Sequence, residues 1–290
     1  MSTRKTRRDF LRLSAAAAAA GCTLRASSAF AGTHDGMAYG VQLYMVRKEA
    51  PADLAGVLKH IRQTGFTQVE LYPIAYTHPA AELRKMVEDA GLGHDSAHFD
   101  YDSIPSKIDY GKQLGLKYMV CSILPKNLWS SPAGFREAAE NFNTWGKQVH
   151  DAEMQLVFHN HNYEFNQLGD TTGFDVLMEH TDPALVKLEF DLYWLTQAGQ
   201  DPAAMMKKYK DRLVLIHLKD RIAGSPVNYA PDDEQHIIEL GKGSIKWQPL
   251  LSQARAQGVK LALLDQDETK LPVFESMKAN FDYLNGLKLS

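Results

Sequence analysis

The sequence predicts a single-domain (β/α)8 barrel, the fold also called a TIM barrel. Three observations support this: short β-type runs alternate eight times with segments of helical period, glycines separate many of them, and several apolar runs end in polar residues. The expected strands cover residues 39–43, 68–71, 94–98, 118–122, 156–159, 186–191, 213–217 and 261–265. Eight such repeats over roughly 250 residues are typical of this barrel.

An open, doubly wound sheet is the alternative fold, but no Gly-rich dinucleotide-binding loop follows the first expected strand. The segments between the strands are amphipathic. Residues 52–64 and 132–152, for example, each place apolar side chains on one helical stripe. The one long irregular stretch, residues 221–243, is expected to form a loop above the mouth of the barrel.

The N-terminus has the features of a twin-arginine signal peptide. Arg7 and Arg8 precede a short Ala-rich apolar run over residues 13–21. A permanent transmembrane helix needs about 20 apolar residues, so this run predicts export without a permanent membrane span. Cys22 leaves a lipoprotein anchor as the alternative.

Cleavage of the leader is expected before Gly32, because Ala29 and Ala31 supply the small residues that signal peptidase requires. The sequence therefore predicts two regions: residues 1–31 as the signal peptide and residues 32–290 as the barrel domain. Passage through the twin-arginine export machinery places the mature protein in the periplasm.

Charge and cysteine content restrict the classes of function. The whole chain carries a formal charge of −3 at pH 7, and the leader holds six basic residues against one acidic residue, so the barrel is more acidic than the whole. An acidic body argues against nucleic acid and anionic membranes as partners. Cys121 is the one cysteine beyond the leader, so residues 32–290 have no intramolecular disulfide.

Polar side chains end four of the apolar runs. The fifth run ends in His159 and continues into His161 and Glu164; the next three end at Asp191, His217 and Asp265. Alternate residues of a strand face the same side, and barrel enzymes hold their active sites at the C-terminal ends of the strands. Four strand ends that offer oxygen and nitrogen donors therefore predict one metal site.

Several motifs occur in a fixed order between residues 40 and 267. They are Gln42-Leu43-Tyr44, Val69-Glu70, His159-Asn160-His161-x-x-Glu164-Phe165, Phe190-Asp191, His217-Leu218-Lys219-Asp220, Leu240-Gly241-x-Gly243 and Asp265-Gln266-Asp267. In these motifs the chain resembles the xylose-isomerase-like sugar phosphate isomerase/epimerase superfamily of TIM barrels. The motifs identify the superfamily strongly and any one substrate weakly.

The resemblance implies a divalent metal ion held by Glu164, Asp191, His217 and Asp265. The last position departs from the family, which has Glu there; Asp is one methylene shorter, so coordination through water or by Asp267 stays open. Carboxylates with one imidazole favour Mn²⁺ or Mg²⁺, with Co²⁺ or Zn²⁺ as alternatives. Participation of His159 or His161 as a ligand also stays open.

Seven further residues are expected in the site. Glu70, His161 and Lys219 are candidates for acid, base or electrostatic roles, and the residues expected to bind substrate are Gln42, His98, His159 and Trp194. Simpler roles remain open for three of them: a salt bridge at the rim for Glu70, a solvated loop position for Lys219 and core packing for Trp194.

These features predict an exported, metal-dependent isomerase or epimerase of a small carbohydrate that acts through an enediolate. Because sugar phosphates are scarce outside the inner membrane, a free sugar or keto-sugar is the expected substrate. A 3-keto-glycoside lyase or hydratase and a sugar-binding barrel without metal are the alternatives. An abasic endonuclease shares the distant fold, but the acidic body disfavours it. The sequence does not predict the oligomeric state.

Overall fold

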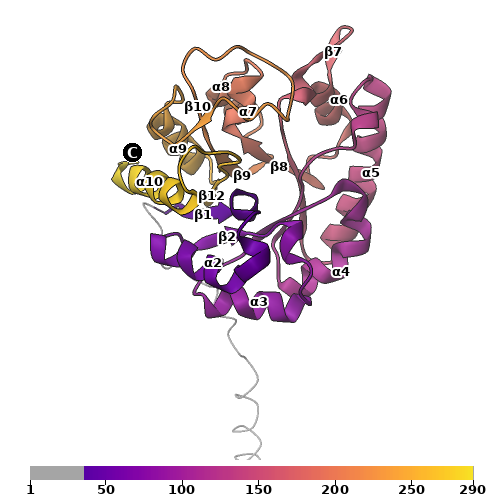
Figure 1. Ribbon diagram of the computed structural model, residues 1–290. Coiled ribbons are helices and arrows are strands. Elements are labelled where there is room, and N and C mark those ends of the chain that lie inside the picture. Colours follow the sequence, from indigo (N-terminus) through magenta and orange to yellow (C-terminus); the bar gives the residue numbers. More distant parts are fainter. Residues whose placement is uncertain (1–35, 290) are drawn as a thin grey trace, which may run out of the picture. The chain divides into compact units, whose positions relative to one another are not determined.

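Eight parallel strands form a nearly closed barrel in the computed structural model, which describes residues 36–289 (Figure 1). The strands are β1 (Ala38–Gln42), β2 (Gln68–Glu70), β3 (Ser96–Phe99), β4 (Tyr118–Cys121), β5 (Gln155–His159), β8 (Val186–Asp191), β9 (Leu213–Leu218) and β12 (Leu261–Leu264). Their order is β2-β1-β12-β9-β8-β5-β4-β3. The ends of this sheet meet through parallel bridges from Gln68 to Gly93 and from Leu71 to Ala97.

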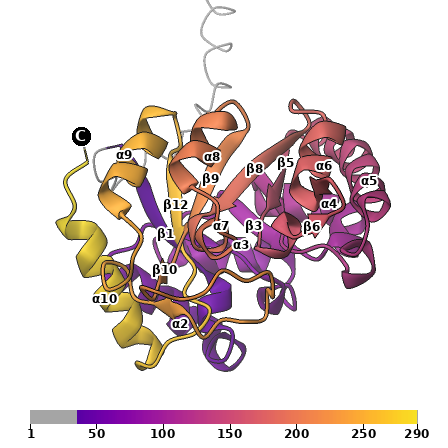
Figure 2. The same cartoon turned by 90° about the horizontal axis from the view of Figure 1, so that it is seen from above.

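Helices cover the outside of the barrel and follow one another around it in chain order (Figures 1 and 2). They are α2 (Ala50–Thr64), α3 (Ala80–Asp89), α4 (Ile104–Leu114), α5 (Pro132–Asp151), α6 (Gly173–His180), α7 (Leu192–Gln197), α8 (Pro202–Lys208), α9 (Trp247–Ala256) and α10 (Val273–Gly286). The last helix, α10, contacts α2. Within residues 36–289, no helix combines the length and apolar character needed to cross a bilayer.

The predicted barrel is confirmed, and all eight expected strands are present with their ends shifted by no more than about two residues. Local sequence explains the boundaries of the helices. Helix α5, for example, starts where the Ser131 hydroxyl accepts a hydrogen bond from the Gly134 N–H and Pro132 takes the first helical position. The predicted signal peptide, residues 1–31, lies outside the described residues.

Strand register brings the polar strand ends together. In the parallel pairs, His159 lies opposite Glu189, Asp191 opposite His217, and His217 opposite Leu263. The register of β8 against β9 shifts between Leu188 and Glu189. The C-terminal ends of β5, β8, β9 and β12 therefore open at one end of the barrel, where enzymes of this fold have their sites.

The segment of residues 221–243 is fastened to the barrel at both ends by one carboxylate. Asp220 is fully buried and accepts hydrogen bonds from the N–H groups of Arg221 at 2.8 Å, Gly241 at 2.9 Å, Gly243 at 3.2 Å and Ile245 at 3.0 Å. A Cβ on Gly243 would lie 2.3 Å from Asp220 Oδ1, so only glycine fits there. Asp220 thus joins two of the sequence motifs, residues 217–220 and residues 240–243. We call Asp220 and the four N–H groups that donate to it the Asp220 clasp.

A short antiparallel pair, β10 (Asp220–Arg221) with β11 (Ile237–Ile238), joins the start of this mouth segment (residues 221–243) to its later part. Its middle is held by Asn162, whose Nδ2 donates to the carbonyl oxygens of Asn228 and Ala230, each at 3.1 Å. The predicted loop above the barrel mouth is therefore held in place by hydrogen bonds at both ends and in its middle.

Candidate metal centre and substrate pocket

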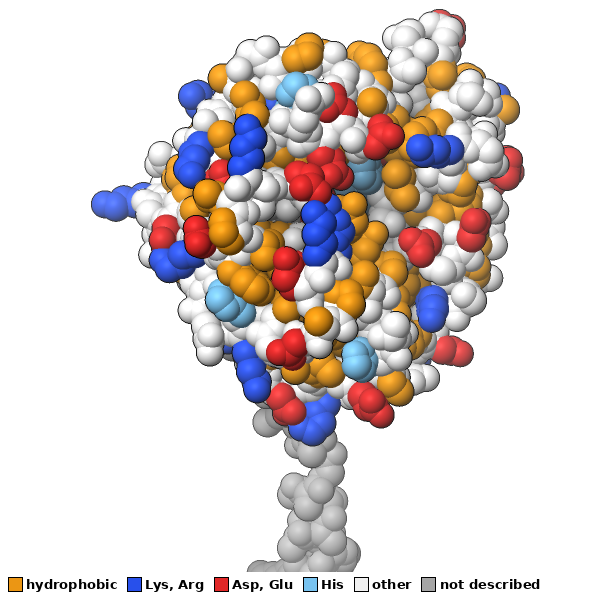
Figure 3. Space-filling model, in the orientation of Figure 1, with side chains coloured by type: hydrophobic (Ala, Val, Ile, Leu, Met, Phe, Trp, Pro, Cys, Tyr) orange, Lys and Arg blue, Asp and Glu red, His pale blue; other side chains and the backbone are white. Residues whose placement is uncertain are grey.

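A cavity of about 260 Å³ opens at the C-terminal ends of the strands. The cavity is lined by all four residues that were expected to bind substrate, together with aromatic and acidic side chains. The lining residues are Gln42, Tyr44, Tyr72, His98, Asp100, Ser122, Ile123, Lys126, Trp129, His159, His161, Trp194, Pro231, Asp232, Glu234, Asp265 and Asp267. Figure 3 shows acidic side chains and a histidine around a hollow near the centre of the face seen along the barrel.

Four buried side chains form a group that fits a metal ion. One donor atom from each of His159, Asp191, His217 and Asp265 lies within 4.8 Å of the others, and we call these residues the metal group. They come from adjacent strand ends, β5, β8, β9 and the residue after β12. Asp265 Oδ1 is buried without a hydrogen-bond partner. A divalent cation bound between this oxygen and the two imidazoles would give the oxygen the partner that it lacks.

Asp265 reaches the metal group although it is shorter than the Glu of the family pattern. Its Oδ2 lies 3.1 Å from His217 Nδ1. Asp267, the alternative that the sequence left open, is not in the group and contacts Lys219 instead.

Glu164 lies in neither group of candidate ligands among the described residues. Both of its carboxyl oxygens accept a hydrogen bond from the His161 N–H, at 3.2 and 3.0 Å. The short 3-10 turn Tyr163–Phe165 produces this geometry by returning the chain toward the strand end. The place in the metal group that the sequence assigned to Glu164 is taken by His159.

Burial raises the pKa of Glu164 from 4.5 to about 8, against the opposing effect of its backbone hydrogen bonds. The contribution of this carboxyl to stability is complete below pH 4.5 and is lost as the pH rises through about 8. The Glu164→Gln variant keeps a neutral side chain and is expected to lose this part of the pH dependence. Thermal unfolding of both metal-free proteins between about pH 5 and about pH 9 measures this difference, and identical pH profiles would contradict the raised pKa of Glu164.

Lys219 is surrounded by carboxylates and almost completely buried. Its Nζ lies 3.0 Å from Asp191, 2.7 Å from Asp265 and 2.5 Å from Asp267. Burial alone would lower the pKa of Lys219, but these three charges raise it well above its usual value. The ammonium therefore balances the acidic residues of the site, and the solvated loop position considered for this lysine does not apply.

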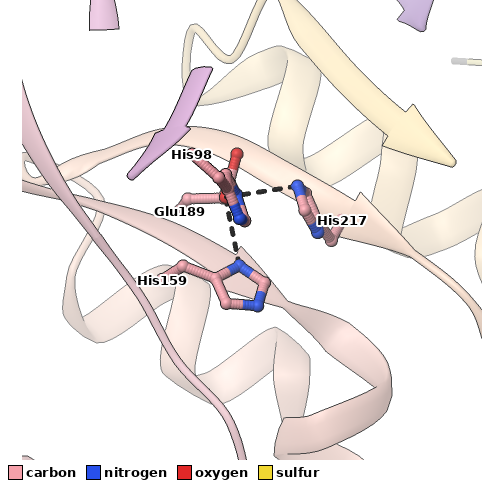
Figure 4. Close-up of side chains that lie close together, drawn as sticks. All are labelled: His98, His159, Glu189 and His217. Carbon is pink, nitrogen blue, oxygen red and sulfur yellow. Dashed lines mark hydrogen bonds and ion pairs between the residues drawn. The ribbon is translucent and has the colours of Figure 1, made fainter. Parts of the chain in front are cut away.

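A second group, which we call the inner network, shares two histidines with the metal group. Figure 4 shows four of its members, His98, His159, Glu189 and His217. Glu70, His98 and Glu189 form it with the two shared histidines, His159 and His217. Glu189 Oε2 lies 2.8 Å from His98 Nε2, 3.0 Å from His159 Nδ1 and 3.2 Å from His217 Nε2. Glu70 Oε2 lies 2.7 Å from His217 Nε2 and 3.1 Å from His98 Nε2. Glu70 is thus fully buried in a network and makes no salt bridge at the rim.

Ionisation in the inner network is set by these contacts. Burial and the neighbouring Glu70 would raise the pKa of Glu189, but His217 and the hydrogen bond from His159 lower it to about 2. Burial opposes protonation of His98, yet Glu70 and Glu189 raise its pKa to about 9. Glu189 is therefore an anion and His98 a cation at neutral pH.

Glu189 was not predicted from the sequence. Strand parity could have found it, because Glu189 precedes Asp191 by two residues and so faces the same side of β8. The other expected residues are in or beside the cavity. Gln42, His98, His159 and Trp194 all line it, as does His161, whose Nδ1 is buried without a partner. Burial, and then Lys219, lower the pKa of His161 to about 3, so this ring is neutral.

A model of the xylose isomerase-like TIM barrel family matches residues 58–265. The chain therefore belongs to this family. Among curated proteins, it is similar to the inosose dehydratase of Clostridium tetani, with 29% identity over 158 residues that cover 50% of this chain and 52% of that protein. An inosose dehydratase of Bacillus anthracis is 36% identical over 108 residues, 37% of this chain and 35% of that protein.

The chain thus spans about half the length of the first relative and about a third of the second. Among solved structures, a sugar phosphate isomerase/epimerase from Parabacteroides distasonis has a TM-score of 0.70 with 24% identity, covering 88% of this chain and 95% of that chain. The IOLI protein with a bound zinc atom has a TM-score of 0.68 with 11% identity, covering 86% and 96%. These structures share the fold, and the curated relatives are enzymes.

Proposed function

We propose that this chain is a metal-dependent isomerase or epimerase that moves a proton next to the carbonyl of an unphosphorylated sugar or keto-sugar. The observation that carries the proposal is the metal group of His159, Asp191, His217 and Asp265, in which the donor atoms lie within 4.8 Å of one another. Two members, His159 and Asp265, also line the cavity. A divalent ion bound there would act as a Lewis acid on the carbonyl and the neighbouring hydroxyl.

Two imidazoles and two carboxylates suit Mn²⁺, Co²⁺ or Zn²⁺ better than Mg²⁺, which prefers oxygen ligands and water. We therefore propose Mn²⁺ as the ion that this site binds, with Co²⁺ and Zn²⁺ as closer alternatives than Mg²⁺. The zinc in the IOLI protein, which has the same fold, is consistent with this order.

Asp267 and Lys219 form the pair best placed to move the proton. Asp267 lines the cavity outside the metal group, and burial together with the charge of Asp265 raises its pKa, which makes its carboxylate a stronger base. The Lys219 ammonium contacts the same carboxylate and stabilises its charged form, while its other N–H groups face Asp191 and Asp265. The neutral His161, with Nδ1 unpaired, is suited to accept a hydrogen bond from a substrate hydroxyl.

The charges of the cavity favour an uncharged substrate. Among the described residues, the lining has one lysine, Lys126. The carboxylates of the lining are those of Asp100, Asp232, Glu234, Asp265 and Asp267. A phosphate dianion would meet net repulsion at the outer part of this cavity. A free sugar or keto-sugar can instead pack a ring face on the aromatic side chains of the lining, such as Trp129.

Proton exchange tests the proposal. The Mn²⁺-loaded chain is incubated in D₂O with a panel of free sugars and keto-glycosides, and NMR follows deuterium at the carbon beside the carbonyl. Deuterium in an isomerised or epimerised product, lost in the Asp191→Asn variant, is the expected result. No exchange with any member of the panel, despite bound metal, would reject the reaction class and favour a sugar-binding barrel.

Elimination is the second candidate reaction, and the inosose dehydratase relatives favour it. Removal of the same proton with departure of a substituent on the next carbon would make the chain a dehydratase or a 3-keto-glycoside lyase. The same NMR experiment separates the two reactions, because elimination gives an unsaturated product and releases water or the aglycone.

We also propose that the protein acts in the periplasm after export by the twin-arginine route. The paired arginines Arg7 and Arg8 before a short apolar run support this. In a bacterial host with the twin-arginine machinery, replacing both arginines with lysine is expected to retain the protein in the cytoplasmic fraction. Unchanged periplasmic recovery would contradict the route.

A further inference from the structure

We propose that Glu189 is a positioning residue that determines which ring nitrogen of His159 faces the metal group. Glu189 is fully buried within β8 and is not part of the cavity lining. Its Oε2 lies 3.0 Å from His159 Nδ1 and 3.2 Å from His217 Nε2. The proposal goes beyond the proposed reaction, because it concerns how the chain prepares its histidines for any metal ion.

The orientation of both rings follows from these contacts. A carboxylate only accepts hydrogen bonds, so His159 presents Nδ1–H to Glu189. His217 presents Nε2–H to Glu70, its nearer carboxylate at 2.7 Å, with Glu189 at 3.2 Å. A neutral imidazole has one N–H and one lone pair, which places the lone pairs on His159 Nε2 and His217 Nδ1. In Figure 4 these two nitrogens lie on the sides of the rings away from Glu189. His217 Nδ1 lies 3.1 Å from Asp265 Oδ2 within the metal group. Without an ion this nitrogen also carries a proton that the carboxylate accepts, and a bound ion would replace that proton.

Glu189 and Glu70 differ in the histidines that they hold. Glu70 Oε2 is 2.7 Å from His217 Nε2, so His217 has two carboxylates that can hold it. Among the contacts of the described residues, the carboxylate that holds His159 Nδ1 is Glu189. Loss of Glu189 should therefore release His159 and leave His217 in place.

Glu189 also belongs, with His98, His159 and His217, to a second group whose donor atoms lie within 4.8 Å of one another. Its hydrogen bonds and its depth in the barrel favour positioning over ligation. Its Oε2 is within 3.2 Å of three imidazole nitrogens, from His98, His159 and His217, which is hydrogen-bond distance for each. Glu189 precedes Asp191 by two residues on the same face of β8, so it lies one layer deeper in the barrel than the ligand position. Glu189 therefore contacts His159 and His217 from the interior of the barrel, below the metal group.

Zinc titration of the metal-free full-length chain, read by competition with a chelator, tests the proposal in three variants. Glu189→Leu removes both acceptors, Glu189→Gln keeps one carbonyl oxygen, and Glu239→Gln is the matched control of a buried carboxyl outside both groups, where it accepts from Thr269 and Ser276. Glu189→Leu is expected to weaken zinc binding about 10- to 100-fold, as loss of a carboxylate behind a ligating histidine does elsewhere. Glu189→Gln should lose less, and Glu239→Gln should bind like the parent.

A second readout reports the rings themselves. In the zinc-loaded chain with ¹⁵N-labelled histidine, NMR is expected to show His159 bound through Nε2 and His217 through Nδ1. In the Glu189 variants His159 should lose this single mode while His217 keeps it. If Glu189→Leu does not fold, Glu189→Gln carries both measurements.

Three results would overturn the proposal. One is zinc affinity in the folded Glu189 variants within twofold of the parent. Another is complete loss of zinc binding in Glu189→Gln, as expected for Asp191→Asn, which would make Glu189 a ligand. The third is an unchanged His159 binding mode in those variants. None depends on turnover, so failure of the proposed reaction leaves this test intact.

Discussion

The His217→Ala variant is expected to lose metal binding and turnover together, which is the largest effect that the structure predicts for one substitution. His217 joins the metal group to the inner network: its Nδ1 faces Asp265 at 3.1 Å and its Nε2 faces Glu70 at 2.7 Å. Removing the ring takes one donor from the ion and leaves buried carboxylates without their partner. Loss of one member of a buried ion pair costs about 3–5 kcal/mol of stability.

Metal analysis, unfolding and the proton-exchange assay measure the three effects separately. His150→Ala is the matched control, because this histidine is exposed on α5 with a side-chain exposure of 69%. If His217→Ala does not fold, Asp191→Asn tests the same metal group. Its amide oxygen can still accept the hydrogen bond that the Trp194 N–H donates to Asp191 Oδ1 at 2.9 Å. Retained zinc or manganese binding in His217→Ala would remove His217 from the metal group.

The Lys219→Met variant is expected to bind metal more tightly and yet turn over at least about 100-fold more slowly. The Lys219 ammonium lies 3.0 Å from Asp191 and 2.7 Å from Asp265, two of the four members of the metal group, so it competes with the ion for their charge. Two unit charges about 4 Å apart interact by about 4 kcal/mol at an effective dielectric of about 20. Removing the ammonium should therefore raise Mn²⁺ affinity by at least about tenfold.

Calorimetric titration with Mn²⁺ measures the affinity, and proton exchange measures turnover. Lys147→Met is the control, since this lysine lies on α5 with a side-chain exposure of 71%. Weaker Mn²⁺ binding in Lys219→Met would show that the ammonium holds the carboxylates in place for the ion and does not compete with it. The opposite directions of affinity and turnover distinguish this variant from any loss of a ligand.

Much of the barrel could be predicted because each strand is short, apolar and bounded by turn residues. The polar residues that end a strand, Asp191 and His217, reached the predicted site because strand parity fixes the side on which they lie. The shorter Asp265 also reached it, since β12 lies beside β9 in parallel register.

Two residues differ from the prediction, Glu164 and Glu189. Strand parity does not extend past the end of β5, so the path of the chain after His159 could not be predicted, and the 3-10 turn sends Glu164 to the His161 backbone. For Glu189, parity with Asp191 predicts the side of β8 on which it lies but not its partners. These come from β3, β5 and β9, and no local pattern reveals contacts between such distant positions.

The Asp220 clasp has a consequence for how such a barrel diversifies. Because one carboxylate holds Arg221 at the start of the mouth segment and Gly241 and Gly243 at its end, the residues between them do not have to maintain the position of either end. Pro231, Asp232 and Glu234, which line the cavity, belong to this intervening stretch. Evolution or a protein engineer can therefore exchange that stretch to recruit new substrates while the metal group beneath it stays intact.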